Sequence, residues 1–430
     1  MKIKAELYKD ARDDGIIEYY AREYNEPKCD ILYEYRHFQS QSDTFNTSQR
    51  RMSYDDGITF TDWETMSDKS DDSRVQGEHV LENILTGKVY NHVHKHTVHI
   101  DNQFIYVGGY EYAMDKWWSG DTRLRPCHFF VNVSDDNGRS YCEMVKYEDG
   151  GDFDPDDWTN SEYLNKNEGY VVGSIIVDDN GDIIFPAEVP MRICCRMLGK
   201  DINDVFPSRP YFPSGIIVFK GKWDGERYNF THSRPVIISD TQSSRGLNEP
   251  AIARLQSGRI VMIVRGSNMM FDDGNCRIVP GAPPVKWYAW SDDGGKTFCE
   301  LMPWHFDDGE IIYSPASISH IVKDANTGKH YWIGNTSDHT AYGNDPRWTL
   351  NIVELDENYG TAVKRTFADI VRRREGESSE VQHSNFNVLQ NRRNGNLEIY
   401  ISKVGQFYDE NDPGSTHFKG EVWRYEIIFD

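Results

Sequence analysis

Long apolar stretches are missing from this sequence of 430 residues. The longest of them, such as residues 260–264, fall far short of the ~18 residues that a membrane-spanning helix needs. The first six residues reach an acidic side chain before the ~7–15-residue apolar core of a leader could form. We therefore expect no membrane partner, and a chain that is either cytoplasmic or a secreted or periplasmic mature form whose leader has been removed.

Positive charge is also scarce, because 47 lysines and arginines face 69 aspartates and glutamates, for a net charge of −22. Proteins that bind nucleic acid gain much of their affinity from lysine and arginine contacts with phosphates. Nucleic acid is therefore not an expected partner. Hydrophobic residues make up 38% of the chain and aromatic residues 13%, which is enough for a sizeable core beneath an acidic surface.

Paired cysteine motifs are absent too. The seven cysteines contain no CxxC pair, and their odd number argues against a disulfide framework or a zinc ribbon. We expect free and mostly buried thiols, with the adjacent Cys194 and Cys195 on opposite faces of a strand. No cofactor is expected.

Helical periodicity is nearly absent, and short alternating strands repeat in its place. The repeated unit is an apolar strand, a turn with glycine and a second apolar strand. Its clearest copies turn at Gly181, Gly258, Gly328 and Gly395, which are 77, 70 and 67 residues apart, and weaker copies lie near residues 30 and 102. A unit of about 70 residues has room for the four short antiparallel strands of a β-propeller blade.

Six such units fill the chain, so we predict an all-β fold, a six-bladed β-propeller that forms a single domain over residues 1–430. Because a lone blade cannot bury both of its faces, the last strand, near residues 421–429, should close the ring against N-terminal segments. Two separate β-sandwiches would need a linker, and the sequence has no Pro-, Gly- or Ser-rich stretch to provide one. The blades are expected at roughly 1–75, 76–150, 165–240, 241–305, 306–375 and 376–430.

A second motif repeats in predicted hairpin turns. Residues 53–60 and 291–298 both read Ser-x-Asp-x-Gly-x-Thr-Phe, and residues 134–141 match with similar side chains. Glycine supplies a positive φ, and the Ser and Asp side chains can bind turn amides. These segments resemble the Asp boxes of the sialidase superfamily, and the resemblance covers most of the chain. In that superfamily the Asp boxes lie far from the active site, so the resemblance implies a structural role for them.

The resemblance also implies an active site. Glu249 opens a predicted inner strand and Arg265 ends the next one, as a glutamate and an arginine do in sialidases. A tight hairpin with two strands of about six residues would return both side chains to one end of the blade. Residues 344–350 are similar to the stretch that supplies another pocket arginine, here Arg347. Two guanidinium groups suit a carboxylate, so these arginines are predicted to bind an acidic sugar.

The nucleophile departs from the family pattern. Sialidases typically use a tyrosine at the start of a late blade, with the glutamate beside it. Alignment of the strand register instead places His383 at this position, where it could act as a general base or nucleophile. Tyr313, Tyr342 and Tyr408 are alternative residues for the same role.

Two further family residues are hard to match. The first pocket arginine of the family is not evident, and Arg22 and Arg36 are the nearest candidates. Asp43, ten residues before the first Asp-box serine, is the candidate acid/base residue. Such an acid would need a pKa raised by burial or by a like charge.

A histidine-rich strand adds candidates that the family comparison does not supply. Residues 91–99 read Asn-His-Val-His-Lys-His-Thr-Val-His, and alternate strand residues share one face. His94 falls at the position equivalent to Glu249, so His94 and His96 are candidates for binding substrate or for catalysis. A divalent metal is an alternative reading, but no nearby carboxylate completes a ligand set, and no metal site is predicted.

Three functions follow from these residues. The leading hypothesis is a glycoside hydrolase, similar to exo-sialidases, that acts on an acidic oligosaccharide or polysaccharide containing sialic acid or uronate. Asp43 would be its acid/base, with Glu249 and His383 on the nucleophile side. The alternative is a polysaccharide lyase similar to ulvan lyases, in which arginines neutralise a uronate and His or Tyr removes a proton. The third is a non-catalytic glycan-binding propeller that stacks sugars on Trp117, Trp118, Trp287 and Trp348.

Overall fold

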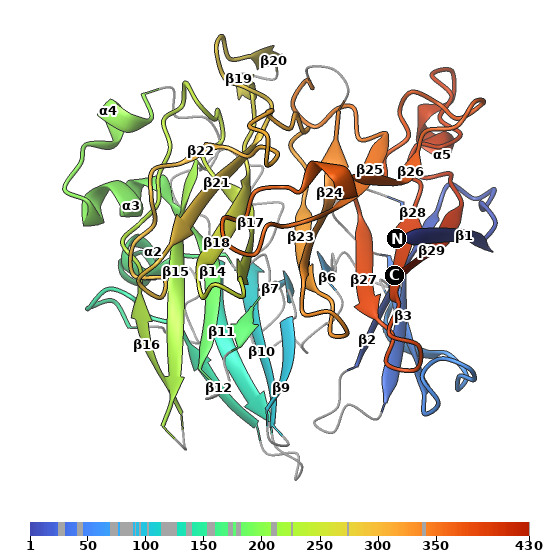
Figure 1. The fold of residues 1–430 in the computed structure, drawn as a ribbon, viewed down its shortest axis with the longest axis horizontal. Coiled ribbons are helices and arrows are strands. Elements are labelled where there is room, and N and C mark those ends of the chain that lie inside the picture. The colour runs from blue at the N-terminus through green and yellow to red at the C-terminus, as the bar shows by residue number, and fades with distance from the viewer. Residues whose placement is uncertain are drawn as a thin grey trace.

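The structure is a computed structural model of the chain. Short antiparallel sheets stand around a common centre in an all-β propeller (Figure 1). The residues that it describes are 1–24, 31–40, 46–68, 76–77, 89–90, 92–93, 96–100, 103–112, 127–134, 140–152, 160–170, 175–177, 182–207, 213–224, 227–272, 275–337 and 341–429.

Within these ranges, five sheets have four antiparallel strands each. The first three consist of β2 (Ile17–Tyr24), β3 (Leu32–Gln39), β4 (Thr47–Ser53) and β5 (Glu64–Asp68); β13 (Ile176–Val177), β14 (Ile183–Pro190), β15 (Ser214–Trp223) and β16 (Tyr228–His232); and β17 (Asn248–Arg254), β18 (Ile260–Arg265), β21 (Lys286–Ser291) and β22 (Met302–Pro303). The other two consist of β23 (Ser319–Lys323), β24 (His330–Thr336), β25 (Thr349–Glu354) and β26 (Ala368–Arg372); and β27 (Phe386–Gln390), β28 (Leu397–Ser402), β29 (Val422–Ile428) and β1 (Lys2–Lys9).

The remaining described strands form one five-stranded sheet and two pairs. The sheet contains β7 (Val89–Tyr90), β9 (His96–Ile100), β10 (Gln103–Tyr112), β11 (Cys127–Ser134) and β12 (Ser140–Met144). The pairs are β6 (Gln76–Gly77) with β8 (His92–Val93), and β19 (Met269–Asp272) with β20 (Asn275–Ile278). Short helices are α2 (Ser161–Asn167), α3 (Met191–Met197), α4 (Ile202–Val205), α5 (Pro413–Thr416) and the 3₁₀ helix η1 (Lys364–Thr366). In the described parts of the chain, no helix has the length and apolar character that a membrane crossing requires.

The predicted strand–glycine–strand units are the first hairpins of their sheets. They correspond to β17–β18, β23–β24 and β27–β28, each paired antiparallel. Gly258, Gly328 and Gly395 take φ angles of +87°, +71° and +73° in these turns, a region that glycine enters without steric cost. The repeat is therefore confirmed at these three positions, whereas Gly181 lies outside the described residues.

Apolar side chains fill the space between neighbouring sheets. Every residue of β18 is buried, because sheets cover both of its faces. Ile260 and Met262 pack with residues of the β13–β16 sheet, while Val261 and Ile263 pack towards the β23–β26 sheet. A strand buried on both faces reads as a continuous apolar run, which explains the sequence from residue 260 to 264.

The last strand closes the ring onto the first. β29 pairs antiparallel with β1 from Lys2 opposite Ile428 to Lys9 opposite Val422. This pairing confirms the predicted contact between residues 421–429 and an N-terminal segment. The two chain ends consequently lie side by side (Figure 1).

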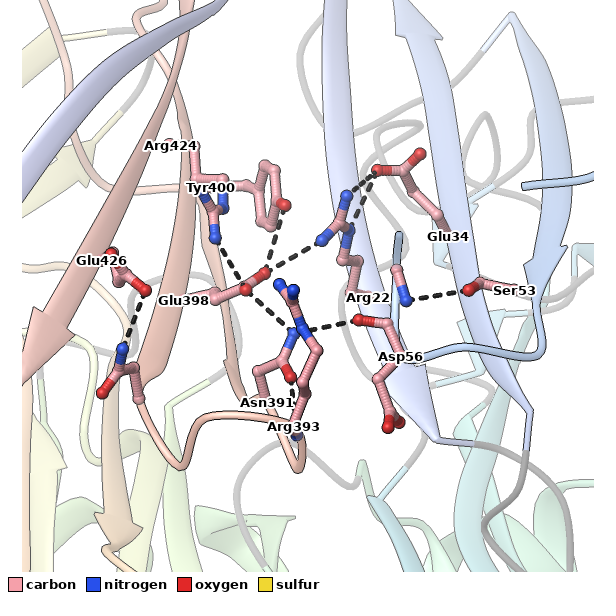
Figure 2. Close-up of polar contacts among 12 residues, drawn as sticks. Arg22, Glu34, Ser53, Asp56, Asn391, Arg393, Glu398, Tyr400, Arg424 and Glu426 are labelled. Atoms are coloured by element: carbon pink, nitrogen blue, oxygen red, sulfur yellow. Dashed lines mark hydrogen bonds and ion pairs between the residues drawn. The ribbon is translucent and has the colours of Figure 1, made fainter. Parts of the chain in front are cut away.

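Charged side chains, not only apolar ones, join the first sheet to the last. Arg22 of β2 donates to Glu34 of β3 at 3.0 Å and to Glu398 of β28 at 2.9 Å (Figure 2). Arg424 of β29 binds the other oxygen of Glu398 at 2.7 Å, and Arg51 of β4 binds Glu34. Each buried carboxylate is thus shared by two guanidinium groups, which offsets the cost of burying its charge. We call these five residues the closing seam.

The two adjacent cysteines lie in a helix, and the prediction of a strand is wrong. Met191, Cys194 and Cys195 are buried members of α3, and their i, i+3, i+4 spacing gives the helix one apolar face. Gly199, with φ of +66°, follows the end of the helix. Cys194, Cys195 and Cys299 are free thiols, as predicted for these three.

The two described Ser-x-Asp turns have the same hydrogen-bond pattern. In residues 53–60, Ser53 Oγ accepts the Gly57 N–H at 2.8 Å, and Asp55 accepts the Thr59 N–H at 2.8 Å and its hydroxyl at 2.7 Å. The equivalent bonds in residues 291–298 are 2.9, 3.0 and 2.6 Å. Bonds from Thr59 and Ser53 lower the pKa of Asp55 to about 2. The motif therefore clamps a turn, as predicted, while the third copy lies partly outside the described residues.

Candidate functional site

Glu249 and Arg265 meet at the end of their sheet where β17 begins. Asn248 pairs with Arg265, and a register shift before Ala251 leaves Glu249 in a bulge with a φ of +47°. Arg265 Nη1 donates to Glu249 Oε1 at 2.6 Å. The hairpin thus brings together two residues that lie 16 positions apart in the sequence.

A buried lysine lies directly beside this pair. Lys286 opens β21 opposite Arg265, and its ammonium group donates to the carbonyl of Ser317. Burial, together with the positive charges of Arg265 and Arg347, lowers the pKa of Lys286 to about 7 although Glu249 acts in the opposite direction. Sequence reasoning missed this residue. The available signal was a lysine in an apolar strand that the antiparallel register places next to Arg265.

Arg347 approaches the same carboxylate from the β23–β26 sheet. Its Nη2 donates to the carbonyl of Ala316 at 2.6 Å, and its Nη1 lies 3.2 Å from Ser384 Oγ. Burial would raise the pKa of Glu249, but Arg265, Lys286 and Arg347 hold it below its usual value. Glu249 is therefore a carboxylate among three cations, and we call these four residues the candidate site.

His383 is buried in the protein, where it contacts the backbone of Arg347 and Trp348. Its backbone N–H donates to the carbonyl of Arg347 at 2.9 Å, and its Nδ1 lies 2.7 Å from the carbonyl of Trp348. A carbonyl accepts only from a donor, so Nδ1 carries the proton and Nε2 is the acceptor nitrogen. The side chain has 0% exposure, and burial together with the charge of Lys403 lowers its pKa to about 4. The imidazole is therefore neutral at pH 7.

Two exposed tyrosines adjoin the candidate site. Tyr313 forms a backbone bridge to Val285, the neighbour of Lys286. Tyr342 lies two residues before Asn344, whose side-chain oxygen accepts from Arg265 at 3.2 Å. Both side chains are more than 40% exposed, at 45% and 41%, so they are available to a ligand.

Neither candidate for the first arginine of the family pattern joins Glu249. Arg22 is held in the closing seam, and Arg36 lies over the ring of Trp63 at 4.2 Å. Lys286 is instead the third cation of the candidate site.

Other predicted residues have different outcomes. Asp43 and His94 lie outside the described residues. His96 belongs to β9, where its backbone pairs with Val107. Trp287 is buried, so it cannot serve as a stacking platform for a sugar.

Two further side chains near Glu249 were missed in the sequence. Glu188 of β14 accepts the Glu249 N–H at 2.7 Å and the Asn248 side-chain amide at 2.8 Å. His320 of β23 lies close enough for Glu249 to affect its pKa, although burial lowers that pKa to about 4. The only sequence signal for either is a polar residue within a strand, because Glu188 and His320 each belong to a different sheet from the one that holds Glu249.

No family model matches the chain, and a search of curated proteins finds no similar sequence. Solved structures do match in fold. A crystal structure of a protein of unknown function from Dyadobacter fermentans has a TM-score of 0.56 at 13% identity, covering 99% of both chains. A mutant of Trypanosoma rangeli sialidase that displays trans-sialidase activity has a TM-score of 0.53 at 13% identity. NanB sialidase from Streptococcus pneumoniae has a TM-score of 0.53 at 9% identity. The fold is sialidase-like.

The alignments cover nearly all of this chain but only part of each sialidase chain. The chain aligns over 99% of its own length with both of them, but this spans 59% of the T. rangeli chain and 70% of the NanB chain. The shared part is thus the propeller, and the identity of 9–13% makes this a likeness of fold.

Proposed function

We propose that the protein is a glycoside hydrolase, similar to exo-sialidases, that acts on a sialic acid or uronate residue of an acidic oligosaccharide or polysaccharide. The observation that carries the proposal is the candidate site, in which Glu249 faces Arg265, Lys286 and Arg347. Among the four residues of the candidate site, one carboxylate faces two permanently charged guanidinium groups and a lysine with a pKa of about 7, in a chain whose net charge is −22. The carboxylate of an acidic sugar is a suitable second anion. Two of the similar folds are sialidases, which supports the same substrate class.

Each side chain has a role in this proposal. Arg265 and Arg347 bind the sugar carboxylate, and Glu249 acts on the nucleophile side. Asp43 is the proposed acid/base. Because His383 is fully buried, we assign it the positioning of the Arg347 segment in place of the catalytic role expected from the sequence.

Further residues would contact the glycan outside the charged centre. Tyr313 offers an exposed ring beside the candidate site, which suits stacking on a sugar. His94 and His96 remain proposed substrate-binding residues.

The proposal includes the architecture. We infer that the five-stranded sheet of β7 and β9–β12 is the second blade of a six-bladed propeller, which forms one domain over residues 1–430 with the blade limits given above. The Ser-x-Asp turns would then be Asp boxes. Their shared hydrogen-bond pattern supports this assignment.

A uronate lyase is the second candidate, and one observation favours it. Hydrolysis by the sialidase route needs a tyrosine beside the glutamate. Among the described residues, Glu249 Oε1 binds Arg265 and Oε2 has no hydrogen-bond partner, so no tyrosine is bonded to this carboxylate. In a lyase, the cations would stabilise the negative charge that develops when a base such as Tyr313 removes the proton next to the uronate carboxylate.

One assay separates these functions. The full chain is incubated with sialosides and with uronate polysaccharides, while released sugar and the ultraviolet absorbance of an unsaturated product are both followed. Sugar without the absorbance supports the hydrolase, and the absorbance supports the lyase. Binding by calorimetry without cleavage identifies a glycan-binding propeller, and an absence of both overturns the proposal.

A pair of variants ties the activity to the candidate site. Glu249→Gln removes the carboxylate and should reduce turnover by on the order of 10²-fold or more. Glu354→Gln removes the same charge from a carboxylate that pairs with Lys329 at 2.9 Å, away from the candidate site, and serves as the matched control. Equal activity in the two variants would contradict the assignment of Glu249.

A further inference from the structure

The backbone of Glu249 has a conformation that its side chain disfavours. Its φ of +47° lies in the left-handed region, which costs free energy for any residue with a Cβ atom. Such a conformation persists only where surrounding contacts hold it. Pro250 follows and has no N–H to donate to the strand ladder, which is compatible with the bulge between Asn248 and Ala251.

A carboxylate from the neighbouring sheet provides those contacts. Glu188 Oε1 accepts the N–H of Glu249 at 2.7 Å, and Glu188 Oε2 accepts the Asn248 amide at 2.8 Å. Glu188 is only 5% exposed, so little water competes for these bonds. Ser214 holds the same segment from β15, because its hydroxyl donates to the carbonyl of Leu247 at 2.7 Å and accepts from Asn248 at 3.0 Å.

We propose that Glu188 is a positioning residue that keeps Glu249 in the left-handed conformation and thereby directs the Glu249 carboxylate towards Arg265. Its effect on turnover rests on the proposed function, whereas its effect on the Glu249 backbone does not. Glu188 itself touches neither the sugar nor the cations in this proposal. It acts through the N–H that immediately precedes the side chain of Glu249.

The chemistry of the clamp explains why a carboxylate is needed. Two donors, the Glu249 N–H and the Asn248 amide, converge on two acceptor oxygens. A glutamine at this position has one acceptor oxygen, and its NH₂ group would face a donor. Glu188→Gln should therefore break one of the two bonds without changing the size of the side chain. Glu188→Asp keeps both oxygens but is one methylene shorter.

Crystal structures test the backbone role without any substrate. In Glu188→Gln, Glu249 is expected to leave the left-handed region or its carboxylate to separate from Arg265. If Glu188→Gln does not fold, Glu188→Asp replaces it in the same measurement, because its side chain is one methylene too short to accept both bonds from the same backbone position. A variant in which the φ of Glu249 and its bond to Arg265 are unchanged would overturn the proposal.

Steady-state kinetics test the consequence for turnover. Glu188→Gln should lower kcat by about tenfold, as expected for a displaced catalytic group, and change KM by less than about twofold. The matched control is Glu168→Gln, which disrupts the ion pair with Arg192 in the same part of the fold and should leave both constants unchanged. Equal losses of kcat in the two variants would overturn the positioning role. If the wild-type protein cleaves no acidic glycan, the proposed function fails, and the crystal structures still decide whether Glu188 holds Glu249.

Discussion

The closing seam makes a prediction about the stability of the whole ring. Glu398 is 1% exposed and accepts from Arg22 at 2.9 Å and from Arg424 at 2.7 Å. Glu398→Ala leaves two guanidinium groups with fewer partners inside the protein. Removing one member of a buried ion pair typically costs about 3–5 kcal/mol. Arg22 keeps Glu34 and Arg424 keeps Glu6, so we expect a loss of about 3 kcal/mol, at the lower end of that range.

The assay is equilibrium unfolding in urea, with the free energy extrapolated to water. The control is Lys4→Ala, which removes an exposed ion pair with Glu426 on the same sheet. Exposed pairs are worth about 0–1 kcal/mol, so this variant should change stability little. Equal losses in the two variants would refute the reasoning that burial gives the closing seam its importance.

The pH dependence of this contribution follows from Glu398. Burial acts to raise its pKa, but Arg424 and Arg22 hold it below its usual value. A depressed folded-state pKa means that the stabilisation is complete above the unfolded-state pKa and is lost as the pH falls through the folded-state pKa. Lowering the pH should therefore reduce the difference in the free energy of unfolding between the wild-type protein and Glu398→Ala.

Three other expectations concern recognition and the turns. Arg265→Lys keeps a positive charge but loses the planar guanidinium group that can bind both oxygens of a carboxylate, so the binding free energy for an acidic sugar, measured by calorimetry, should weaken by about 1–3 kcal/mol. The control Arg259→Lys, which changes only the pair with Asp292, should leave that binding free energy unchanged. Lys286 is charged below its pKa of about 7, so the affinity for an acidic sugar should weaken as the pH rises through 7. Lys286→Met should bind the sugar more weakly, and its affinity should not change with pH near 7. Asp55→Ala removes the bonds to Thr59 and should lower the unfolding midpoint without altering affinity, and a change in affinity would contradict a purely structural turn.

Local features of the sequence predicted the fold well, because they depend on neighbouring residues. The turns at Gly258, Gly328 and Gly395 need a positive φ within a short hairpin. The Ser-x-Asp turns bond residues that are only four positions apart, as in Ser53 and Gly57. A motif of this kind specifies its structure before any distant contact forms.

Contacts between sheets could not be predicted in the same way. Arg22 and Glu398 lie 376 positions apart, and Glu188 and Glu249 lie 61 apart. Nothing in either local pattern indicates the partner. Lys286 was also missed, because its importance depends on the pairing of β21 with β18 and on the approach of Arg347 from another sheet.

The prediction of a strand at Cys194 was wrong for a related reason. Seven residues are too few to give a convincing helical period, and a β-rich context favoured a strand. The burial of Cys194 in the core with Val189 and Ile193 stabilises the helix in the folded protein. Packing in the folded protein therefore determined the secondary structure of a segment whose local pattern was ambiguous.

The pairing of β1 with β29 also has a consequence for synthesis on the ribosome. β1 precedes the other described strands in the sequence and has to remain without its partner until Val422–Ile428 has been made, so ring closure is a late, long-range step. Lysines at positions 2, 4 and 9 make β1 a poor template for pairing with other chains during this wait. Because the chain ends are adjacent, a circular permutant that begins after β1 and carries β1 behind β29 would turn this distant pairing into a local hairpin. Such a permutant should close its ring faster than the protein with the original order of strands.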